Sequence, residues 1–371
     1  MRTSAQSRLA HLKAIRHSRI TVALARRFRN IGRFVDSVAA TVLSQYAPLC
    51  TAYYALFNRG LDRETRAVLA GRRVFELNRN APDKTSSLVR RNVHRLEKGI
   101  LMRPRRRLFA LDYIQETVTA YAHLIHAQRD CLGTRNEELN WAHDVLSEYF
   151  KITDKHPRAD QARATFQGLG APSSPGTVSA TPYKRASRKH QLPSYDSLVQ
   201  LSQQRRSVRW FEQRPVDRSL ILKALEIATQ APSACNRQPY VFRFYDDPKL
   251  LREVAALPGG TKGFDHNFPM IAVVIGELRN YYAEKDRHLI YIDSSLAVMS
   301  FIFALETLGL SSCCINWPDI KEAEEKARVV LNLESDQRPI MFIAIGHADP
   351  EGLVAYSQKK SPAELATFNF K

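Results

Sequence analysis

Cysteine is scarce in this sequence of 371 residues, and its five cysteines follow no recognisable pattern. They are Cys50, Cys131, Cys235, Cys313 and Cys314, with no CxxC pair and no metal-ligand spacing. An odd and scattered set argues against a disulfide framework and against a bound metal. We therefore expect a reducing compartment, the cytoplasm, and no metal site.

Acidic residues are absent from the first 35 positions, which hold nine lysines and arginines. Residues 1–200 contain 34 Lys and Arg against 16 Asp and Glu, whereas residues 201–371 contain 21 of each. The net charge of +18 therefore belongs to the N-terminal half, which indicates two modules with different partners. An anionic membrane surface or a protein partner would suit the first module. Nucleic acid is not expected, because charge alone supports it and no binding motif is present.

Charge is also lacking in residues 37–57, yet this stretch is a poor candidate for a membrane span. A spanning helix needs about 20 predominantly apolar residues, and here serine, threonine, glutamine and proline interrupt the run. A buried helix is the leading interpretation. A helix lying on a membrane surface and a membrane span remain as alternatives, so a cytoplasmic protein bound peripherally to a membrane would fit.

The chain is longer than one typical domain, and its composition changes near residue 168. Residues 60–165 indicate several helices. His94 and Lys98 share one face of a predicted helix there. They could form a site for an anion or a partner, but we prefer the interpretation of a surface helix that ends at Gly99. Residues 168–195 are dense in Gly, Pro, Ser and basic residues, which is typical of a linker. We therefore predict a basic, mainly helical region at 1–167, a linker at 168–195 and a second domain at 196–371.

Helices and apolar strands alternate in the second domain. Asp217 can cap a helix that stops before Pro232, and Gly309 can close a long apolar helix over residues 289–308. Further helices are predicted at 248–257 and 320–331, and strands at 240–245, 271–275, 312–316 and 340–345. This order predicts an α+β or α/β sandwich whose sheet is covered by helices.

The first cluster of chemically useful residues is RRSVRWF at positions 205–211. In an extended chain Arg205, Ser207 and Arg209 point to one side. Two guanidinium groups and a hydroxyl on one face make a cradle for a phosphate or a polyol. A solvated basic turn or a target site of a kinase could have the same sequence.

The second cluster is PSACNRQPY at positions 232–240, between a predicted helix end and a predicted strand. Two prolines bracket Ser233, Asn236 and Gln238, whose side chains both donate and accept hydrogen bonds. Such groups suit the edge of a flavin ring, although a capped turn would look alike. The third cluster, at residues 356–365, contains Lys359 and Lys360, which could close a phosphate site or belong to a solvated tail.

Together and in this order, RRSVRWF, PSACNRQPY and KKSP resemble the motifs of the nitroreductase family, as does the turn Leu308-Gly309-Leu310 after the long helix. The resemblance covers about half of the chain. It implies a nitroreductase-like central sheet covered by helices, with FMN held at the interface of a homodimer. The residues that it assigns to FMN phosphate and ribityl are Arg205, Arg206, Ser207 and Arg209, with Lys360 at the phosphate and Ser233, Asn236 and Gln238 along the flavin.

The resemblance also implies an activity: electrons pass from NAD(P)H through flavin N5 to a small-molecule acceptor in a ping-pong cycle. No catalytic acid or base is assigned. Arg209 or Arg237 is our candidate for the cation that stabilises reduced flavin. The alternative is a flavin-binding scaffold or accessory protein without turnover, attached to a membrane surface or a biosynthetic complex by its basic half.

One segment departs from the family pattern. Many members have a Glu-Gly turn after the short strand, whereas this chain has Ile315-Asn316-Trp317-Pro318. The contact to flavin N5 and the acceptor preference are therefore open, and Trp317 either narrows the pocket or belongs to the core.

Overall fold

A computed structural model describes residues 40–78, 86–129, 136–170, 172, 179–187 and 190–369. The basic segment 1–35 and part of the predicted linker lie outside the described residues. By the density of its contacts the chain divides into two units, Met1–Thr65 and Arg66–Lys371.

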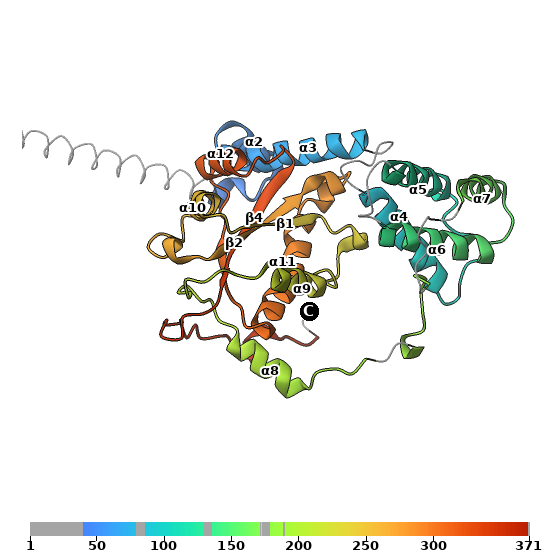
Figure 1. The fold of residues 1–371 in the computed structure, drawn as a ribbon. Coiled ribbons are helices and arrows are strands. Elements are labelled where there is room, and N and C mark those ends of the chain that lie inside the picture. The colour runs from blue at the N-terminus through green and yellow to red at the C-terminus, as the bar shows by residue number, and fades with distance from the viewer. Residues whose placement is uncertain are drawn as a thin grey trace, which may run out of the picture. The chain divides into compact units, whose positions relative to one another are not determined.

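The described elements are mostly helices, with one sheet in the C-terminal half (Figure 1). The α-helices are α2 (Ala47–Leu56), α3 (Asp62–Leu77), α4 (Ser87–Leu101), α5 (Ile114–Arg129), α6 (Asn136–Ile152), α7 (Pro157–Leu169), α8 (Tyr195–Gln204), α9 (Arg218–Ala228), α10 (Pro248–Ala255), α11 (Leu289–Thr307), α12 (Lys321–Val330) and α13 (Pro362–Leu365). The strands are β1 (Tyr240–Tyr245), β2 (Met270–Glu277), β3 (Ser311–Asn316) and β4 (Gln337–Gly346).

The four strands form one antiparallel sheet in the order β1-β2-β4-β3. Side chains of β2 alternate between its two faces. Ile271, Val273 and Ile275 pack in a core with residues of α10 and α12, whereas Met270, Ala272 and Val274 pack with α9 and α11. The predicted α+β domain with a covered sheet is confirmed.

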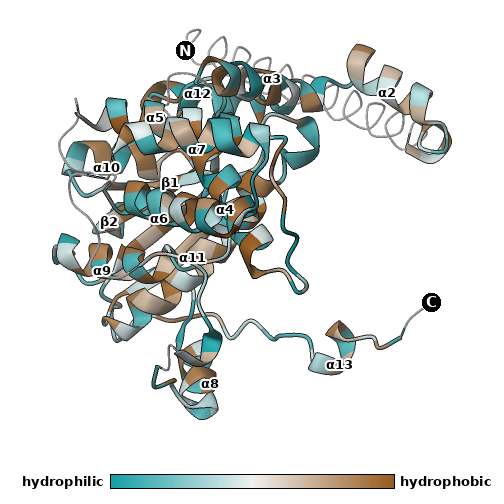
Figure 2. Ribbon diagram, turned by 90° about the vertical axis from the view of Figure 1, so that its right-hand side faces the viewer, coloured by the Kyte–Doolittle hydropathy of each residue, from teal (hydrophilic) through white to brown (hydrophobic). Residues whose placement is uncertain are grey.

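Helix α11 lies at the centre of this domain and is apolar along most of its length (Figure 2). Residues Glu284–Thr307 are long and apolar enough to cross a membrane by length and composition, but half of the most apolar 18-residue window in this stretch is buried. Its inner face packs against α9 and the sheet. Gly309 follows with a φ of 74°, the left-handed conformation expected just beyond a helix end. We conclude that α11 is a core helix.

Helices α4 to α7 form a bundle with its own hydrophobic core (Figure 1). Tyr121 and Tyr149 are fully buried in it, and both hydroxyls have hydrogen-bond partners: the ring of His143 at 3.2 Å and the carbonyl of Phe109 at 2.8 Å. The predicted helical character of the N-terminal region is confirmed. This region is not wholly separate, however, because Ala67 of α3 packs with Leu278.

Two local predictions in the N-terminal half are wrong. Helix α2 carries no buried residue, so the uncharged stretch is not a buried helix. Helix α4 continues through Gly99 to Leu101, so the predicted end of the helix at this glycine is wrong. A side chain at Gly99 would overlap the ring of Phe109, so the glycine is required for close packing.

Candidate functional site

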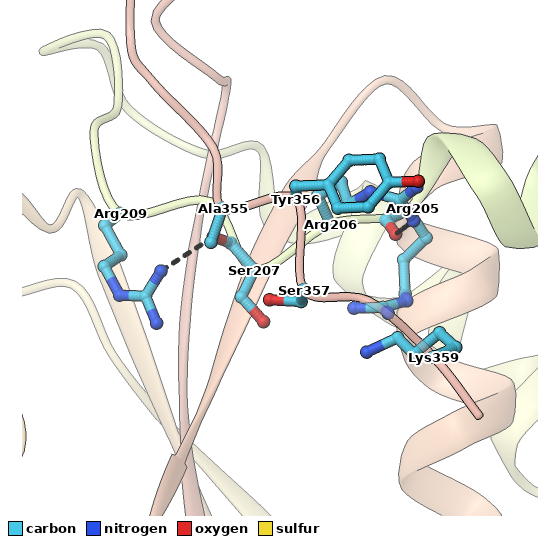
Figure 3. A pocket seen from close by; sticks show the side chains of 8 residues that line it. All are labelled: Arg205, Arg206, Ser207, Arg209, Ala355, Tyr356, Ser357 and Lys359. Atoms are coloured by element: carbon cyan, nitrogen blue, oxygen red, sulfur yellow. Dashed lines mark hydrogen bonds between the residues drawn. The ribbon is translucent and has the colours of Figure 1, made fainter.

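A pocket at the edge of the sheet collects two of the three predicted clusters (Figure 3). It measures about 60 Å³ and is lined by Arg205, Arg206, Ser207, Arg209, Ala355, Tyr356, Ser357 and Lys359. Figure 3 shows Arg205 and Lys359 directed toward the same space beside Ser357. The pocket would admit a group the size of a phosphate, but whole small-molecule sites measure roughly 300–1,000 Å³.

The arginine segment is held in place by its apolar residues and by one buried amide. Ser207 bridges Ser312 of β3, so this segment runs along the outer edge of that strand. The side chain of Asn267, which is 6% exposed, accepts from the backbone N–H of Phe211 and donates to the carbonyl of Arg209, both at 2.8 Å. Nothing in the sequence around Asn267 announced this positioning role.

Positive charge in the pocket has little compensation. Within the described part of the chain Arg205, Arg206 and Arg209 form no ion pair; Arg206 and Arg209 donate only to nearby backbone carbonyls. Burial raises the pKa of Glu306, while a hydrogen bond to Ser311 and the charge of Arg205 oppose this rise. Guanidinium groups without carboxylate partners, gathered around a small cavity, are suited to bind an anion.

The C-terminal tail contributes a different lysine from the one predicted. Lys359 lines the pocket, whereas Lys360 does not. Ser357 has a φ of 50°, and this left-handed residue lies in the segment that carries Tyr356 and Lys359 to the pocket. Neighbouring lysines in a chain without regular structure cannot be told apart from sequence.

The second cluster forms a tight loop at the start of β1, around the 3-10 turn η3 (Ala234–Asn236). Cys235, Asn236 and Gln238 have φ values of 54°, 52° and 49°. Left-handed conformations are unfavourable for residues other than glycine, though least so for asparagine. Three of them in one loop therefore need support from outside it.

That support comes from Asp293 of α11, which is 2% exposed. Its Oδ2 accepts from the Ser233 hydroxyl at 2.7 Å and from the Ala234 N–H at 2.9 Å. The Ser233 hydroxyl oxygen in turn accepts from the Gln238 N–H at 2.8 Å. Asp293 was missed in the sequence, although it is the one acid in the apolar run 289–305.

Arg237, one candidate for the cation near the flavin, is part of this loop and does not line the pocket. Its side chain is 9% exposed, and its Nη1 donates to Asp286 at 3.1 Å. The guanidinium also lies over the ring of Tyr281, 4.9 Å from the centroid. Arg209, the other candidate, lines the pocket with an exposed side chain.

The structure does not bring the pocket and the loop together within one chain. Ser207 lies beyond β3, whereas Gln238 precedes β1, at the opposite edge of the sheet. Four strand spacings amount to ~19 Å. Ser312 is also level with Met270, whereas Tyr240 is level with Gly276 at the other end of β2, a further ~20 Å along the strands.

Trp317, in the segment that departs from the family pattern, is part of the core. It is 8% exposed, packs against Phe342 with ring centroids 5.1 Å apart, and donates from Nε1 to Glu324 at 2.6 Å. The pocket residues do not include it. These contacts support its interpretation as a core residue.

A covered antiparallel sheet with a cationic pocket at its edge defines an α+β domain suited to an anionic ligand. Residues 203–258 and 247–347 match the sequence model of the Nitroreductase family. The C-terminal half of the chain therefore carries a domain of this family of oxidoreductases.

Individual proteins match a similar share of the chain. The chain is 26% identical over 175 residues to an iodotyrosine deiodinase of Thermotoga neapolitana. This match covers 41% of this chain and 89% of the relative. An FMN-dependent nitroreductase from Clostridium difficile is 24% identical, covers 47% of this chain and 99% of its own, and has a TM-score of 0.40. A nitroreductase family protein from Clostridium novyi is 22% identical, covers 41% and 85%, and has a TM-score of 0.37.

Proposed function

We propose that the C-terminal domain binds FMN and uses it to carry electrons from NAD(P)H to a small-molecule acceptor. The observation that carries this proposal is the pocket of Arg205, Arg206, Ser207, Arg209 and Lys359, whose arginines form no ion pair in the described part of the chain. A phosphate ester would supply the missing negative charge, with several charge-assisted hydrogen bonds. The match to the Nitroreductase family supports FMN as the ligand that carries it.

The residues present fit such a cofactor. Arg205 and Lys359, which line the same pocket, would bind the phosphate, and Ser207 would bond to the polyol that follows. Ser233, Asn236 and Gln238 offer donors and acceptors for the ring edge, in a loop whose shape Asp293 fixes in advance. When bound, FMN supplies a ring that accepts a hydride and releases electrons singly or in pairs.

The chain's own contribution is then binding, orientation and charge. We assign the cation near the reduced ring to Arg209, whose side chain is exposed and forms no ion pair in the described part of the chain. Replacing Arg209 with Ala would lower the flavin potential if it has this role. We assign no catalytic acid or base.

The visible absorption spectrum of the purified full-length protein tests the proposal directly. We expect oxidised-flavin bands that bleach when NADH or NADPH is added without oxygen. Nitroaromatics, quinones and iodotyrosine would then be tried as acceptors, the last because of the deiodinase relative. A protein that takes up no FMN when it is supplied would contradict the proposal, and flavin that stays oxidised would favour the scaffold without turnover.

We further propose a homodimer in which each flavin site uses the pocket of one copy and the loop of the other. The diagonal separation of Ser207 and Gln238 across the sheet supports this, because one chain cannot bring both to a single flavin. The outer face of α11 also supports it: Ile292, Leu296 and Met299 are 52%, 43% and 40% exposed and recur at helical spacing. An apolar stripe of this kind on a folded domain is typical of an interface.

Mixing two inactive variants tests the shared site. Arg205→Ala removes a pocket residue and Asn236→Ala removes a loop residue, so each homodimer should be inactive. A mixed dimer would hold one site with both substitutions and one site with neither. Recovery of activity after unfolding and refolding the mixture, up to about a quarter of wild type from random pairing, is the expected result; no recovery, with folded dimers formed, would contradict the shared site.

For residues 1–65 we propose attachment to an anionic membrane surface on the cytoplasmic side. The first 35 residues carry nine basic residues and no acid. Helix α2 has no charge, and Leu49 and Leu56 are exposed on it, as is Phe57 just after it. We expect the protein to cosediment with vesicles that contain phosphatidylserine and not with vesicles of phosphatidylcholine alone. Equal binding to both would mean that apolar contacts, and not the basic residues, attach the protein to the membrane.

A further inference from the structure

The helical bundle reaches the loop that is expected to line the flavin. Helix α4 packs against η3, and Arg91 on α4 lies near enough to Arg237 and Cys235 for their charges to interact. Arg95 follows one turn later on the same face of α4. The charge of Arg91 therefore interacts with two other arginines, Arg237 of the loop and Arg95 of its own helix.

Their charges are unequally compensated. Arg237 pairs with Asp286 at 3.1 Å, but its Nε is buried without a hydrogen-bond partner. Arg95 lies 3.8 Å from Asp112 and stacks on the ring of Tyr113 at 3.6 Å. Arg91, half-buried, forms neither a hydrogen bond nor an ion pair with any residue that the structure describes.

Among the described residues, Glu116 is a carboxylate whose charge acts on Arg91, and it already accepts a hydrogen bond from the Asn92 side chain at 3.1 Å. Burial lowers the pKa of Arg91, and the charges of Arg237 and Arg95 lower it further. Guanidinium groups that repel one another in a half-buried place are costly for the folded protein. A bound anion would remove that cost.

We propose that Arg91 and Arg237 bind an anionic group, a carboxylate or a phosphate, of the electron acceptor. The site combines a residue of the helical bundle with a residue of the flavin loop. The proposed function is needed only to identify the bound molecule as the electron acceptor, because anion binding by the two arginines requires no flavin. Asp293 supports the loop through two hydrogen bonds and so fixes the position of the Arg237 backbone. An anionic group bound there would therefore hold the acceptor in one orientation.

Paired acceptors that differ in one charge test the proposal in the holoenzyme. We compare 4-nitrobenzoate and 4-nitrophenyl phosphate with neutral 4-nitrobenzyl alcohol. Arg91→Gln should raise KM for the two anions at least tenfold and leave the alcohol unchanged. Lys98→Gln is the matched control: it removes the same charge from an exposed position about 10 Å further along α4, and it should change none of the three.

Arg91→Lys keeps the charge without the planar fork and should give an intermediate KM for the anions; it also serves if Arg91→Gln folds poorly. Equal losses for the anions and the alcohol would overturn the proposal, as would no loss at all. In a ping-pong cycle KM for NADH is measured separately. A rise confined to NADH would assign the arginines to the reductant and overturn the assignment to the acceptor.

A binding measurement separates this proposal from the flavin. Benzoate should raise the melting temperature of the full-length protein stripped of FMN, and of Lys98→Gln, but not of Arg91→Gln. If benzoate binds through Arg91 while the protein takes up no FMN, the anion site stands and the proposed redox function fails. If flavin binds and is reduced while benzoate has no effect on any variant, the anion site is overturned.

Discussion

The helical bundle of α4 to α7 and the pocket of the C-terminal sheet domain differ in how their charged side chains are partnered. In the bundle Arg90 pairs with Glu138 at 3.0 Å, and the indole N–H of Trp141 donates to Glu97 at 3.0 Å. In the sheet domain the pocket arginines form no ion pairs in the described part, and three residues of one loop are left-handed. Arginines without ion pairs and left-handed residues thus concentrate at the candidate site, as is common where binding groups are held in place.

Arg91 is the exception that links the two regions. It belongs to the bundle by sequence and lies at the flavin loop in space. The bundle would then be more than a spacer, because it supplies part of the surface that selects the substrate. Four changes test how far the two regions differ.

The largest effect is expected from the pocket. Arg205→Ala combined with Arg209→Ala should weaken FMN binding by about 10²–10⁴-fold, since each charge-assisted hydrogen bond contributes about 1.5–3 kcal/mol. The free energy of unfolding without FMN should change little, because neither side chain pairs with an acid. Fluorescence titration of FMN and urea unfolding measure the two quantities.

Arg218→Ala is the control for the pocket arginines, since Arg218 is exposed and pairs with Asp246 at 2.7 Å away from the pocket. It should bind FMN as wild type does. A loss of affinity in the control equal to that of the double variant would mean that net charge, and not the pocket, attracts the cofactor.

The next effect concerns the bundle core. Leu146→Ala empties a fully buried position and should lower the free energy of unfolding by about 2–5 kcal/mol, whereas Leu101→Ala, at an exposed position, should cost little. FMN affinity of the folded Leu146→Ala protein should match wild type. A parallel loss of FMN binding would show that the bundle and the sheet domain are one cooperative structure.

A smaller effect is expected at the support of the flavin loop. Asp293→Asn exchanges a buried carboxylate acceptor for an amide, which weakens two hydrogen bonds by about 1–3 kcal/mol in total. Hydrogen exchange at the Ala234 amide should be about 10–100-fold faster. Asp247→Asn, which retains a capping side chain at α10, should leave that amide unchanged; unchanged exchange in Asp293→Asn would mean that the loop holds its own shape.

The smallest effect is a pH dependence within the bundle. Burial lowers the pKa of His143, against a smaller opposite effect of Asp144. A histidine whose pKa is depressed in the folded state adds stability above its unfolded pKa of about 6.5, and this stability is lost as the pH falls through the folded pKa. His143→Gln should therefore lose less stability than wild type between pH 7 and pH 5, measured by urea unfolding; the same loss in both would place the acid sensitivity elsewhere.

Local pattern in the sequence determined most of the elements of the C-terminal half. The strand at 240–245 was predicted with the bounds that β1 has, and Asp217 caps α9 as expected, through a 2.8 Å hydrogen bond from the Ser219 N–H. These succeed because apolar periodicity and capping depend on neighbours in the chain. The order of the three motifs likewise identified the family without any structure.

Tertiary packing decided what local pattern could not. The sequence around Gly99 is typical of a helix end, but this glycine instead allows Phe109 to pack closely. The uncharged stretch around α2 remains exposed. The support of the loop by Asp293 and the approach of Arg91 to Arg237 join residues far apart in sequence, and no spacing announces either. Sequence by itself determined the family of the C-terminal domain, because its motifs are local; only the tertiary structure, through the order of its strands, set Ser207 and Gln238 at opposite corners of the sheet.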